Sequence, residues 1–466
     1  MVRRRALLPA FRRLRADRLV PASARNENDP GLPPMMLASM LVVLLVFTLL
    51  GMEIAWAIAL SCFFYIGLSQ FTGHPTEFTL FAQQMTVGLD TFVLVSVPLF
   101  IFAGELMNVC GVTQRLVRLA AVAVGHMHGG LANVGVVTNF LMSGISGSAV
   151  ADAAATGTVL VPEMRKRRFP DDFACAVIAC AATVGPIIPP SIVFLLIASI
   201  INVSVGQLFL AGVVPGVLMT IFMFGVTWWL CRKRDYPREA RVSGKERIGA
   251  LRDGVLALIA PAIIVGSIVG GIATPTESAA IAVGYTLFLG IFVYRNTPLK
   301  AVVEAAGSAA AGSALVMLTV AASQIFAWLA VQERLGEILT TSMLAVSDNL
   351  YAMLFMVNVL MLVLGMFMEV VPVIFILAPI IFPWLAKMGV SEVQLAVVMT
   401  LNLMIGMITP PIGLNLMVLS AITGVDVMRI FRASVPYLGA LLAVLALITY
   451  IPQLTLFVPH LFYPVK

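Results

Sequence analysis

The sequence predicts an all-α polytopic membrane protein with two inverted repeats, each containing five spanning helices, one of them broken, and a re-entrant helical hairpin. The first observation is composition: 60% of the 466 residues are apolar and only 11% are charged, too few to cover the surface of a soluble fold. The second is an internal repeat of the sequence. The third is the placement of Lys and Arg between apolar segments, which is typical of membrane topology signals.

The apolar stretches set the number of spans. A membrane helix needs about 20 mostly apolar residues to cross about 30 Å of hydrocarbon, and beyond residue 35 the chain is largely a succession of such stretches. Residues 1–35 differ, because they carry eight arginines followed by the breaker-rich run NENDPGLPP. We interpret them as a basic tail that is disordered or not native, and favour an upstream start, with Met35 or Met36 as the natural first residue, over a targeting segment.

A repeat fixes the expected architecture. The stretch VGPIIPPSIVFLLIAS from Val184 reappears without gaps as IGMITPPIGLNLMVLS from Ile405, an offset of 221 residues. The same offset aligns Pro162 with Pro383. The expected units are repeat 1 over 36–231, a cytoplasmic basic linker over 232–253, repeat 2 over 254–458 and a C-terminal tail over 459–466.

Each copy is expected to contain two helices joined at a tight corner, then a third helix, a hairpin, a broken helix and a last span. The last four elements are predicted near 89–111, 132–163, 172–205 and 207–230 in copy one, and near 303–331, 352–385, 393–424 and 430–456 in copy two.

The hairpin is predicted from residues that do not suit a spanning helix. Its centre is SGISGSAVADAAATG over 143–157 and GMFMEVVP over 365–372, with Gly, Ser, Pro and a carboxylate where Leu would be expected. We therefore interpret each as two half-helices whose tip lies at mid-membrane. Five full crossings remain in each copy. Because five is odd, the second copy starts on the opposite side of the membrane and is inverted relative to the first.

The basic residues test this topology. With the first span running inward, the cytoplasmic segments collect 18 Lys and Arg residues beyond the tail and the opposite side collects three, in agreement with the positive-inside rule. Both termini are then expected outside. The formal charge of +6 therefore indicates topology rather than nucleic-acid binding.

The two double prolines predict where a binding site lies, because each break is expected to form one side of it. Pro189-Pro190 and Pro410-Pro411 remove backbone donors and unwind the helix, and the freed carbonyls must face protein, water or a cation at that depth. The hairpin tip and break of the first repeat are expected to form an all-oxygen cage for Na⁺. Its predicted ligands are Ser143, Ser146, Ser148, Asp152 and Gly185.

A second, pseudo-symmetric Na⁺ cage is expected in repeat 2. Its predicted ligands are Gly365, Met368, Gly406 and Thr409. Half-helix N-termini that converge at the midplane favour an anionic substrate group. The predicted substrate contacts are Pro190, Ser191, Pro411 and Asn415, although ordinary intrahelical hydrogen bonding is the alternative for Ser191 and Asn415.

Carboxylates inside apolar segments are further candidates, because each costs about 2.5–3.5 kcal/mol at a helix centre on insertion scales. They are Asp152, Glu369, Glu105 and Glu277. The alternative is that Asp152 and Glu369 only cap the N-termini of half-helices. The two interpretations are balanced for Asp152, and capping is favoured for Glu369.

Five strings carry a family resemblance over essentially residues 37–460. They are SVPLFIFAGELM from Ser96, SGSAVADAAATG from Ser146, GPIIPPS from Gly185, GGIATPTESAA from Gly270 and GMITPPIGLNL from Gly406. Through them the chain resembles the large membrane subunit of the tripartite ATP-independent periplasmic (TRAP) transporters.

This resemblance implies a Na⁺-driven importer of carboxylate-bearing solutes in the bacterial inner membrane. It implies two protein partners, a small four-helix membrane subunit and a periplasmic solute-binding protein, and an elevator-like motion of the hairpins and broken helices past a fixed scaffold. Na⁺ would be the coupling ion, with no covalent cofactor.

The sequence is compatible with one other function and argues against another. A stand-alone Na⁺/carboxylate symporter or ion antiporter of related inverted-repeat design remains an alternative. An intramembrane enzyme is not expected, because the four His residues all lie outside the middle of the spans and no nucleophile with a base or metal motif is found.

Overall fold

A computed structural model describes residues 35–71, 75–236 and 244–463, and in these ranges the regular structure is helical throughout. Eight of the described helices are long and apolar enough to cross a membrane. The predicted fold class of an all-α polytopic membrane protein is confirmed. The basic tail, apart from Met35, and residues 237–243 of the linker lie outside the described residues.

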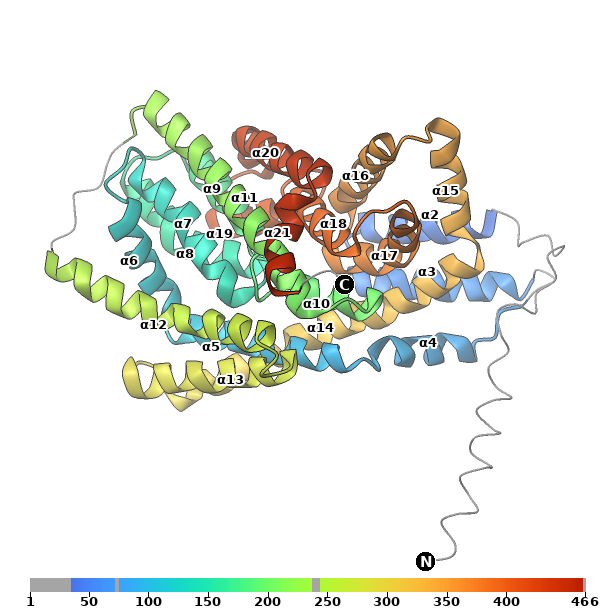
Figure 1. Ribbon diagram of the computed structural model, residues 1–466, viewed down its shortest axis with the longest axis horizontal. Coiled ribbons are helices and arrows are strands. Elements are labelled where there is room, and N and C mark those ends of the chain that lie inside the picture. The colour runs from blue at the N-terminus through green and yellow to red at the C-terminus, as the bar shows by residue number, and fades with distance from the viewer. Residues whose placement is uncertain (1–34, 72–74, 237–243, 464–466) are drawn as a thin grey trace, which may run out of the picture.

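The two halves contain the same series of helices, related by the offset found in the sequence (Figure 1). α8 (Ala149–Lys166) and α17 (Val370–Lys387) begin and end 221 residues apart, and α9 (Asp171–Ala181) and α18 (Glu392–Gly406) begin 221 residues apart. The other pairs are α2 (Met35–Leu49) with α12 (Gly244–Val269), α3 (Ile54–Ser69) with α13 (Pro275–Phe288), α6 (Val112–Val124) with α15 (Leu335–Val346), α7 (Gly130–Ser146) with α16 (Leu350–Phe367), α10 (Ile192–Ile201) with α19 (Leu414–Thr423), and α11 (Val205–Lys233) with α20 (Val427–Tyr450).

The third helix differs between the halves. In the first half it is divided into α4 (Thr79–Leu89), the short η2 (Phe92–Val95) and α5 (Ser96–Val109), whereas α14 (Leu299–Gln332) of the second half is one continuous helix of 34 residues. α14 packs against α3, α4 and α5. We call α2 to α5 and α12 to α14 the scaffold layer, and Figure 1 shows α4, α5, α12, α13 and α14 along one side of the molecule.

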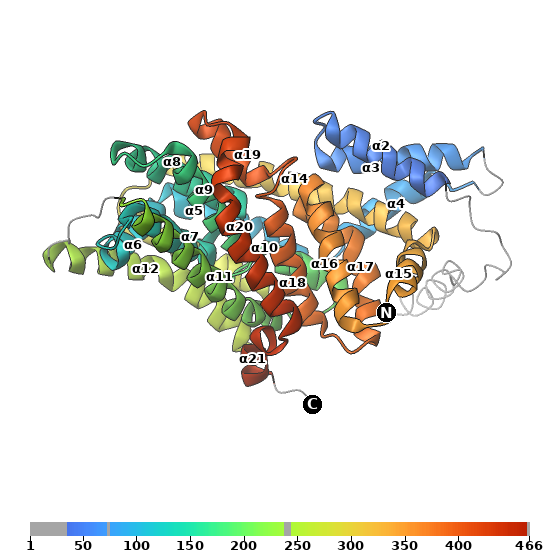
Figure 2. The ribbon, with the colours of Figure 1, turned by 90° about the horizontal axis from the view of Figure 1, so that it is seen from above.

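The hairpins and broken helices, α7 to α11 and α16 to α20, form the second layer, which we call the hairpin layer. Its two halves are interleaved, because α10 packs against α17 and α19 packs against α8. Other helices also pack against the opposite repeat, because α9 contacts α20 and α11 contacts α18. Figure 2 shows α11, α20 and α18 side by side. Each half therefore completes the packing of the other.

Four helices were not among the elements expected from the sequence. One is α4, which ends where the third helix of copy one was expected to begin, near residue 89. α6 and α15 lie between the third helix and the hairpin of each repeat, and α21 (Gln453–Phe462) follows the last span. α6 carries Arg115 and Arg118 beside buried Leu116 and Ala120, so its faces are amphipathic and its length is too short to cross a membrane. The boundary expected at 459 for the C-terminal tail falls inside α21.

Candidate functional site

The tip of the first hairpin is a tight turn between α7 and α8. Gly147 has a φ of +60°, a left-handed conformation that glycine adopts without steric penalty. Ser148 then caps α8, since its hydroxyl accepts a hydrogen bond from the Ala151 amide at 3.4 Å. This turn ends α7 and starts α8 inside the protein, with the positive end of α8 directed at the tip.

Asp152 follows the tip in the first turn of α8 and is completely buried. Its Oδ1 accepts a hydrogen bond from the Ser146 hydroxyl at 2.5 Å. Its Oδ2 is buried without a hydrogen-bond partner among the described residues. The first-turn position of Asp152 agrees with the capping alternative, in which the N-terminus of α8 stabilises its charge, while the unpartnered Oδ2 leaves an acceptor for an ion.

The break between α9 and α10 lies against this tip. A Cβ atom added to Gly185 would lie 2.7 Å from Asp152 Oδ2, and one added to Gly147 would lie 2.7 Å from the Pro190 carbonyl oxygen. The structure therefore brings Ser146, Asp152 and Gly185 together as predicted. Such an arrangement supplies carboxylate, hydroxyl and carbonyl oxygens, the ligand types preferred by hard cations.

Ser143, a predicted Na⁺ ligand, and Ser191, a predicted substrate contact, both have local partners. Ser143 is buried, and its hydroxyl donates to the Phe140 carbonyl at 2.5 Å within α7. The Ser191 hydroxyl donates to the Pro186 carbonyl at 2.5 Å and accepts from the Phe194 amide at 3.1 Å. Ser191 is therefore the N-cap of α10, so for this residue the structure agrees with the local hydrogen-bonding alternative.

The second hairpin and break meet through glycines. A Cβ atom added to Gly406 would lie 2.5 Å from the carbonyl carbon and oxygen of Gly365, so the two backbones touch where neither residue has a side chain. The Ile412 amide donates to the Met366 carbonyl at 3.3 Å. The predicted pairing of tip and break is thus present in repeat 2 as well.

The polar groups of the second site are sparser than those of the first. The Thr409 hydroxyl donates to the Ile405 carbonyl at 2.8 Å, and Met368 is an extended residue between α16 and α17. Glu369 occupies the N-cap position of α17 but is exposed, and its side chain accepts no capping hydrogen bond. The capping role favoured for Glu369 from the sequence is therefore seen in its position and not in its hydrogen bonds.

Asn415 links the two repeats next to both breaks. It is completely buried, and its Nδ2 donates to the Ala179 carbonyl of α9 at 3.3 Å. Its backbone amide donates to the Met407 carbonyl at 3.1 Å and closes the second break. Asn415 Oδ1 is buried without a hydrogen-bond partner among the described residues, so one acceptor is left for another group.

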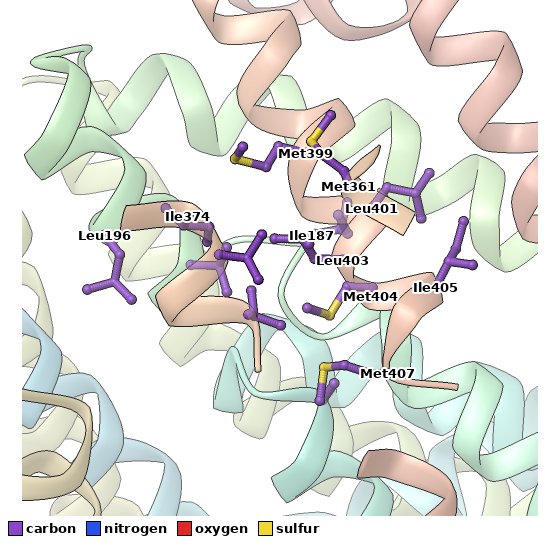
Figure 3. Close-up of a cluster of buried hydrophobic side chains, with 14 of the residues drawn as sticks. Ile187, Leu196, Met361, Ile374, Met399, Leu401, Leu403, Met404, Ile405 and Met407 are labelled. Carbon is purple, nitrogen blue, oxygen red and sulfur yellow. The ribbon is translucent and has the colours of Figure 1, made fainter. Parts of the chain in front are cut away.

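The second prolines of the two pairs differ in accessibility. Pro190 is buried, whereas Pro411 is exposed. Both X-Pro bonds within the double prolines are cis. One apolar cluster contains residues of both repeats, and Figure 3 draws Ile187 of the first break together with Leu403, Met404 and Ile405 of α18. Apolar packing therefore joins the first break to the C-terminal part of α18.

The remaining carboxylate candidates do not join these sites. Glu277 forms a capping box with Thr274 at the start of α13, where its Oε2 accepts the Thr274 amide at 2.8 Å. Glu105 is half-buried on α5 of the scaffold layer. The TPTE sequence at 274–277 matches the capping-box pattern, so the sequence itself signals the role of Glu277.

Known proteins share this sequence and fold. The family model described as "Tripartite ATP-independent periplasmic transporter, DctM component" matches residues 41–454. The sialic acid TRAP transporter large permease protein SiaM of Vibrio cholerae is 36% identical over 412 residues, which cover 88% of this chain and 96% of that protein. The C4-dicarboxylate TRAP transporter large permease protein DctM of Rhodobacter capsulatus is 34% identical over 433 residues, covering 90% and 98%.

A solved structure supports the fold alone. The crystal structure of the Alcanivorax borkumensis YdaH transporter aligns with a TM-score of 0.59 at 16% sequence identity, covering 85% of this chain and 97% of that one. The family match and the spans make the chain a multi-pass protein of the bacterial inner membrane, and a permease rather than an enzyme. We conclude that the chain belongs to the DctM component family, the large permease subunits of the tripartite ATP-independent periplasmic transporters.

Proposed function

We propose that this chain is the permease subunit of a Na⁺-coupled, binding-protein-dependent importer of carboxylate-bearing organic solutes that works by an elevator-type motion. The family assignment supplies the coarser statement, a membrane permease of a TRAP transporter. The coupling ion, the motion and the substrate class are the parts proposed here.

One observation carries the coupling proposal. Asp152 is completely buried and lies beside Gly185 of the broken helix. Its Oδ2 has no hydrogen-bond partner among the described residues. A buried carboxylate without a compensating charge is costly. A Na⁺ ion bound among Asp152, Ser146 and the carbonyls of the break would supply that compensation, and binding the ion would fasten the hairpin tip to the broken helix.

The elevator proposal is supported by how the two layers meet. The hairpin layer is interleaved across both repeats, which favours its movement as one body. A cavity of about 520 Å³ separates parts of the two layers, and it is lined by Gln324 and Trp328 of α14 and by Phe375 and Pro379 of α17. At this cavity the two layers do not touch, which leaves room for one body to move along the other.

The substrate class is proposed from the relatives and the site. SiaM is named for sialic acid and the Rhodobacter capsulatus protein for C4-dicarboxylates, and both compounds carry carboxylates. Four helices begin at the hairpin tips and breaks, namely α8, α10, α17 and α19. Helix N-termini favour anions. Asn415 offers a buried amide at the same place.

The partners follow from the family. TRAP permeases work with a small membrane subunit and a periplasmic solute-binding protein, and we propose both for this chain. The stand-alone symporter remains the second candidate, because the YdaH likeness shows that a related fold occurs in a protein described simply as a transporter.

Uptake by reconstituted protein tests the proposal. Proteoliposomes containing this chain, with and without its two partners, would be given an inward Na⁺ gradient or an equal K⁺ gradient, and uptake of labelled carboxylates would be followed. We expect uptake only with Na⁺ and with both partners. Full uptake by this chain alone would support the stand-alone symporter, and uptake indifferent to Na⁺ would contradict the coupling proposal.

The variant Asp152→Ala separates an ion ligand from a capping residue. We expect it to weaken the Na⁺ dependence of uptake much more than it lowers the amount of folded protein in the membrane. Equal loss of both quantities would indicate a structural role for Asp152.

A further inference from the structure

A second cavity lies between the short amphipathic helix α6 and the scaffold helix α12, which pack against each other. Its volume is about 410 Å³. It is lined by Arg115, Arg118, Ala121 and Val122 of α6 and by Gly249, Ala250 and Asp253 of α12. The topology expected from the basic residues puts this cavity on the cytoplasmic side of the membrane.

Arg115 is held in place at one end of the cavity. Its Nη1 donates to the carbonyls of Cys110 at 3.0 Å and Gly111 at 2.8 Å, the C-terminal end of α5. Its guanidinium lies 3.6 Å from the centroid of the Tyr294 ring. These contacts use one of the three guanidinium nitrogens, so the N–H groups on Nε and Nη2 remain for a ligand in the cavity.

Arg118 and Asp253 supply the free charges. Arg118 lies one turn after Arg115, is exposed, and takes part in none of the ion pairs among the described residues. Asp253 is half-buried on the opposite wall and is likewise absent from those ion pairs. The cavity thus presents two guanidinium groups on one wall and one carboxylate on the other.

The cavity becomes apolar along its length. Ala121 and Val122 follow Arg118 on the same face of α6, because residues three and four apart are neighbours on a helix. Across from them Gly249 is exposed, and nothing lies within 4 Å of the position that a Cβ atom would occupy. Charged groups at one end and an open apolar groove at the other match an amphipathic ligand.

We propose that this cavity binds the head group of phosphatidylethanolamine from the cytoplasmic leaflet. Arg115 and Arg118 would hold the phosphate, which guanidinium groups bind through paired hydrogen bonds. Asp253 would accept a hydrogen bond from the primary ammonium, and the start of the acyl chains would lie along Ala121 and Val122. Basic pockets between membrane helices on the cytoplasmic side commonly take lipid phosphates, and the carboxylate gives this one a preference for an ammonium-bearing head group.

Three lipids and one salt distinguish the possible ligands. Phosphatidylglycerol offers the phosphate without an ammonium, phosphatidylcholine offers an ammonium that cannot donate hydrogen bonds, and inorganic phosphate offers no apolar part. Lipid retained by the purified full-length chain would be titrated by native mass spectrometry. We expect phosphatidylethanolamine to bind at least about tenfold more tightly than either other lipid, because a hydrogen bond to a charged group is stronger than one between neutral groups.

Matched variants locate the site. Arg118→Gln is expected to weaken binding of all three lipids about tenfold, and Asp253→Asn to remove the preference for phosphatidylethanolamine while phosphatidylglycerol binding is kept. Gly249→Leu fills the groove without changing charge and should weaken all three. Arg429→Gln is the control, because Arg429 is an exposed arginine of α20 outside the cavity. This variant should bind the three lipids with the same affinity as the unsubstituted chain.

Two results would overturn the proposal. One is equal lipid binding by the Arg118→Gln and Arg429→Gln proteins, which would mean that the bound lipids lie elsewhere. The other is full displacement of phosphatidylethanolamine by millimolar inorganic phosphate, which would make the cavity a site for the free anion. Loss of folded Arg118→Gln protein would leave Gly249→Leu and Asp253→Asn to decide between the outcomes.

Discussion

The two hairpin tips have the same backbone plan and different chemistry. The first places a buried carboxylate, Asp152, with an unpartnered oxygen against Gly185 of its break. The second places Gly365 against Gly406, backbone to backbone, and its carboxylate, Glu369, is exposed. Repeated structure therefore does not imply repeated charge, and a cation at the second tip would depend on neutral carbonyls and the Thr409 hydroxyl.

The largest contrast is expected from removing the carboxylate at each tip. Asp152→Asn keeps the size of the side chain and removes its charge, so we expect the affinity for Na⁺ to fall about 10- to 100-fold, in line with about 1.5–3 kcal/mol for an interaction with a charged group. Glu369→Gln should change the affinity less than about twofold, as is usual for an exposed group without a partner. The measurement is the Na⁺ concentration that gives half-maximal uptake in proteoliposomes.

Equal effects of the two substitutions would remove the distinction between the tips. Protein recovered from the membrane serves as the control for folding. A larger effect of Glu369→Gln would mean that the second tip carries the coupling charge.

The glycine contacts should separate ion binding from stability. Gly406→Ala would press a methyl group into the Gly365 carbonyl at 2.5 Å, and overpacking of this kind costs about 1–3 kcal/mol of folding stability. Gly185→Ala would instead approach Asp152 Oδ2 at 2.7 Å, so we expect it to weaken Na⁺ binding more than stability. Thermal unfolding in detergent and Na⁺ titration of uptake measure the two quantities.

Gly439→Ala is the matched control for these substitutions. Nothing lies within 4 Å of the Cβ position at Gly439 in α20, and alanine stabilises a helix relative to glycine by roughly 0.5–1 kcal/mol. Its melting temperature should be unchanged or higher. A Gly406→Ala protein as stable as Gly439→Ala would show that the second tip and break are not in close contact.

The smallest contrast concerns the serines of the first tip. The Ser146 hydroxyl donates to Asp152 Oδ1, whereas the Ser143 hydroxyl donates to the backbone of its own helix. Removing one hydrogen bond costs about 0.5–1.5 kcal/mol, so Ser146→Ala should weaken Na⁺ affinity by about three- to tenfold. Ser143→Ala should have a smaller effect in the same titration, and the reverse order would mean that Ser143 faces the ion.

The sequence predicted those parts of the fold that depend on local chemistry. Double prolines at a constant offset located both breaks, and Gly, Ser, Pro and a carboxylate inside apolar stretches located both hairpin tips, because such residues interrupt helices. The contact of Asp152 with Gly185 followed from the same pattern. The apolar stretches do not predict α6, although Arg115 and Arg118 alternate with Leu116, because its 13 residues are too few for a span.

Long-range packing could not be predicted in this way. Asn415 donates to the Ala179 carbonyl 236 residues away, and no local pattern specifies that α19 lies beside α9 and α8. The local partner of Ser191 was left open for a similar reason, since a serine after a double proline suits either a cap or a ligand. The apolar faces of the membrane helices produce a periodic sequence pattern. That pattern does not identify the helix against which each face packs.

The crossed packing of α10 on α17 and of α19 on α8 has a consequence for biosynthesis. A ribosome completes α8 some 250 residues before it completes α19, ending at Thr423, and during that interval the first hairpin lacks α19 as a neighbour. The N-terminal half inserted alone would leave the face of α8 that contacts α19 open to lipid. Insertion of the second half is therefore the step that covers this face, and a chain truncated before α19 is expected to be cleared by membrane proteases.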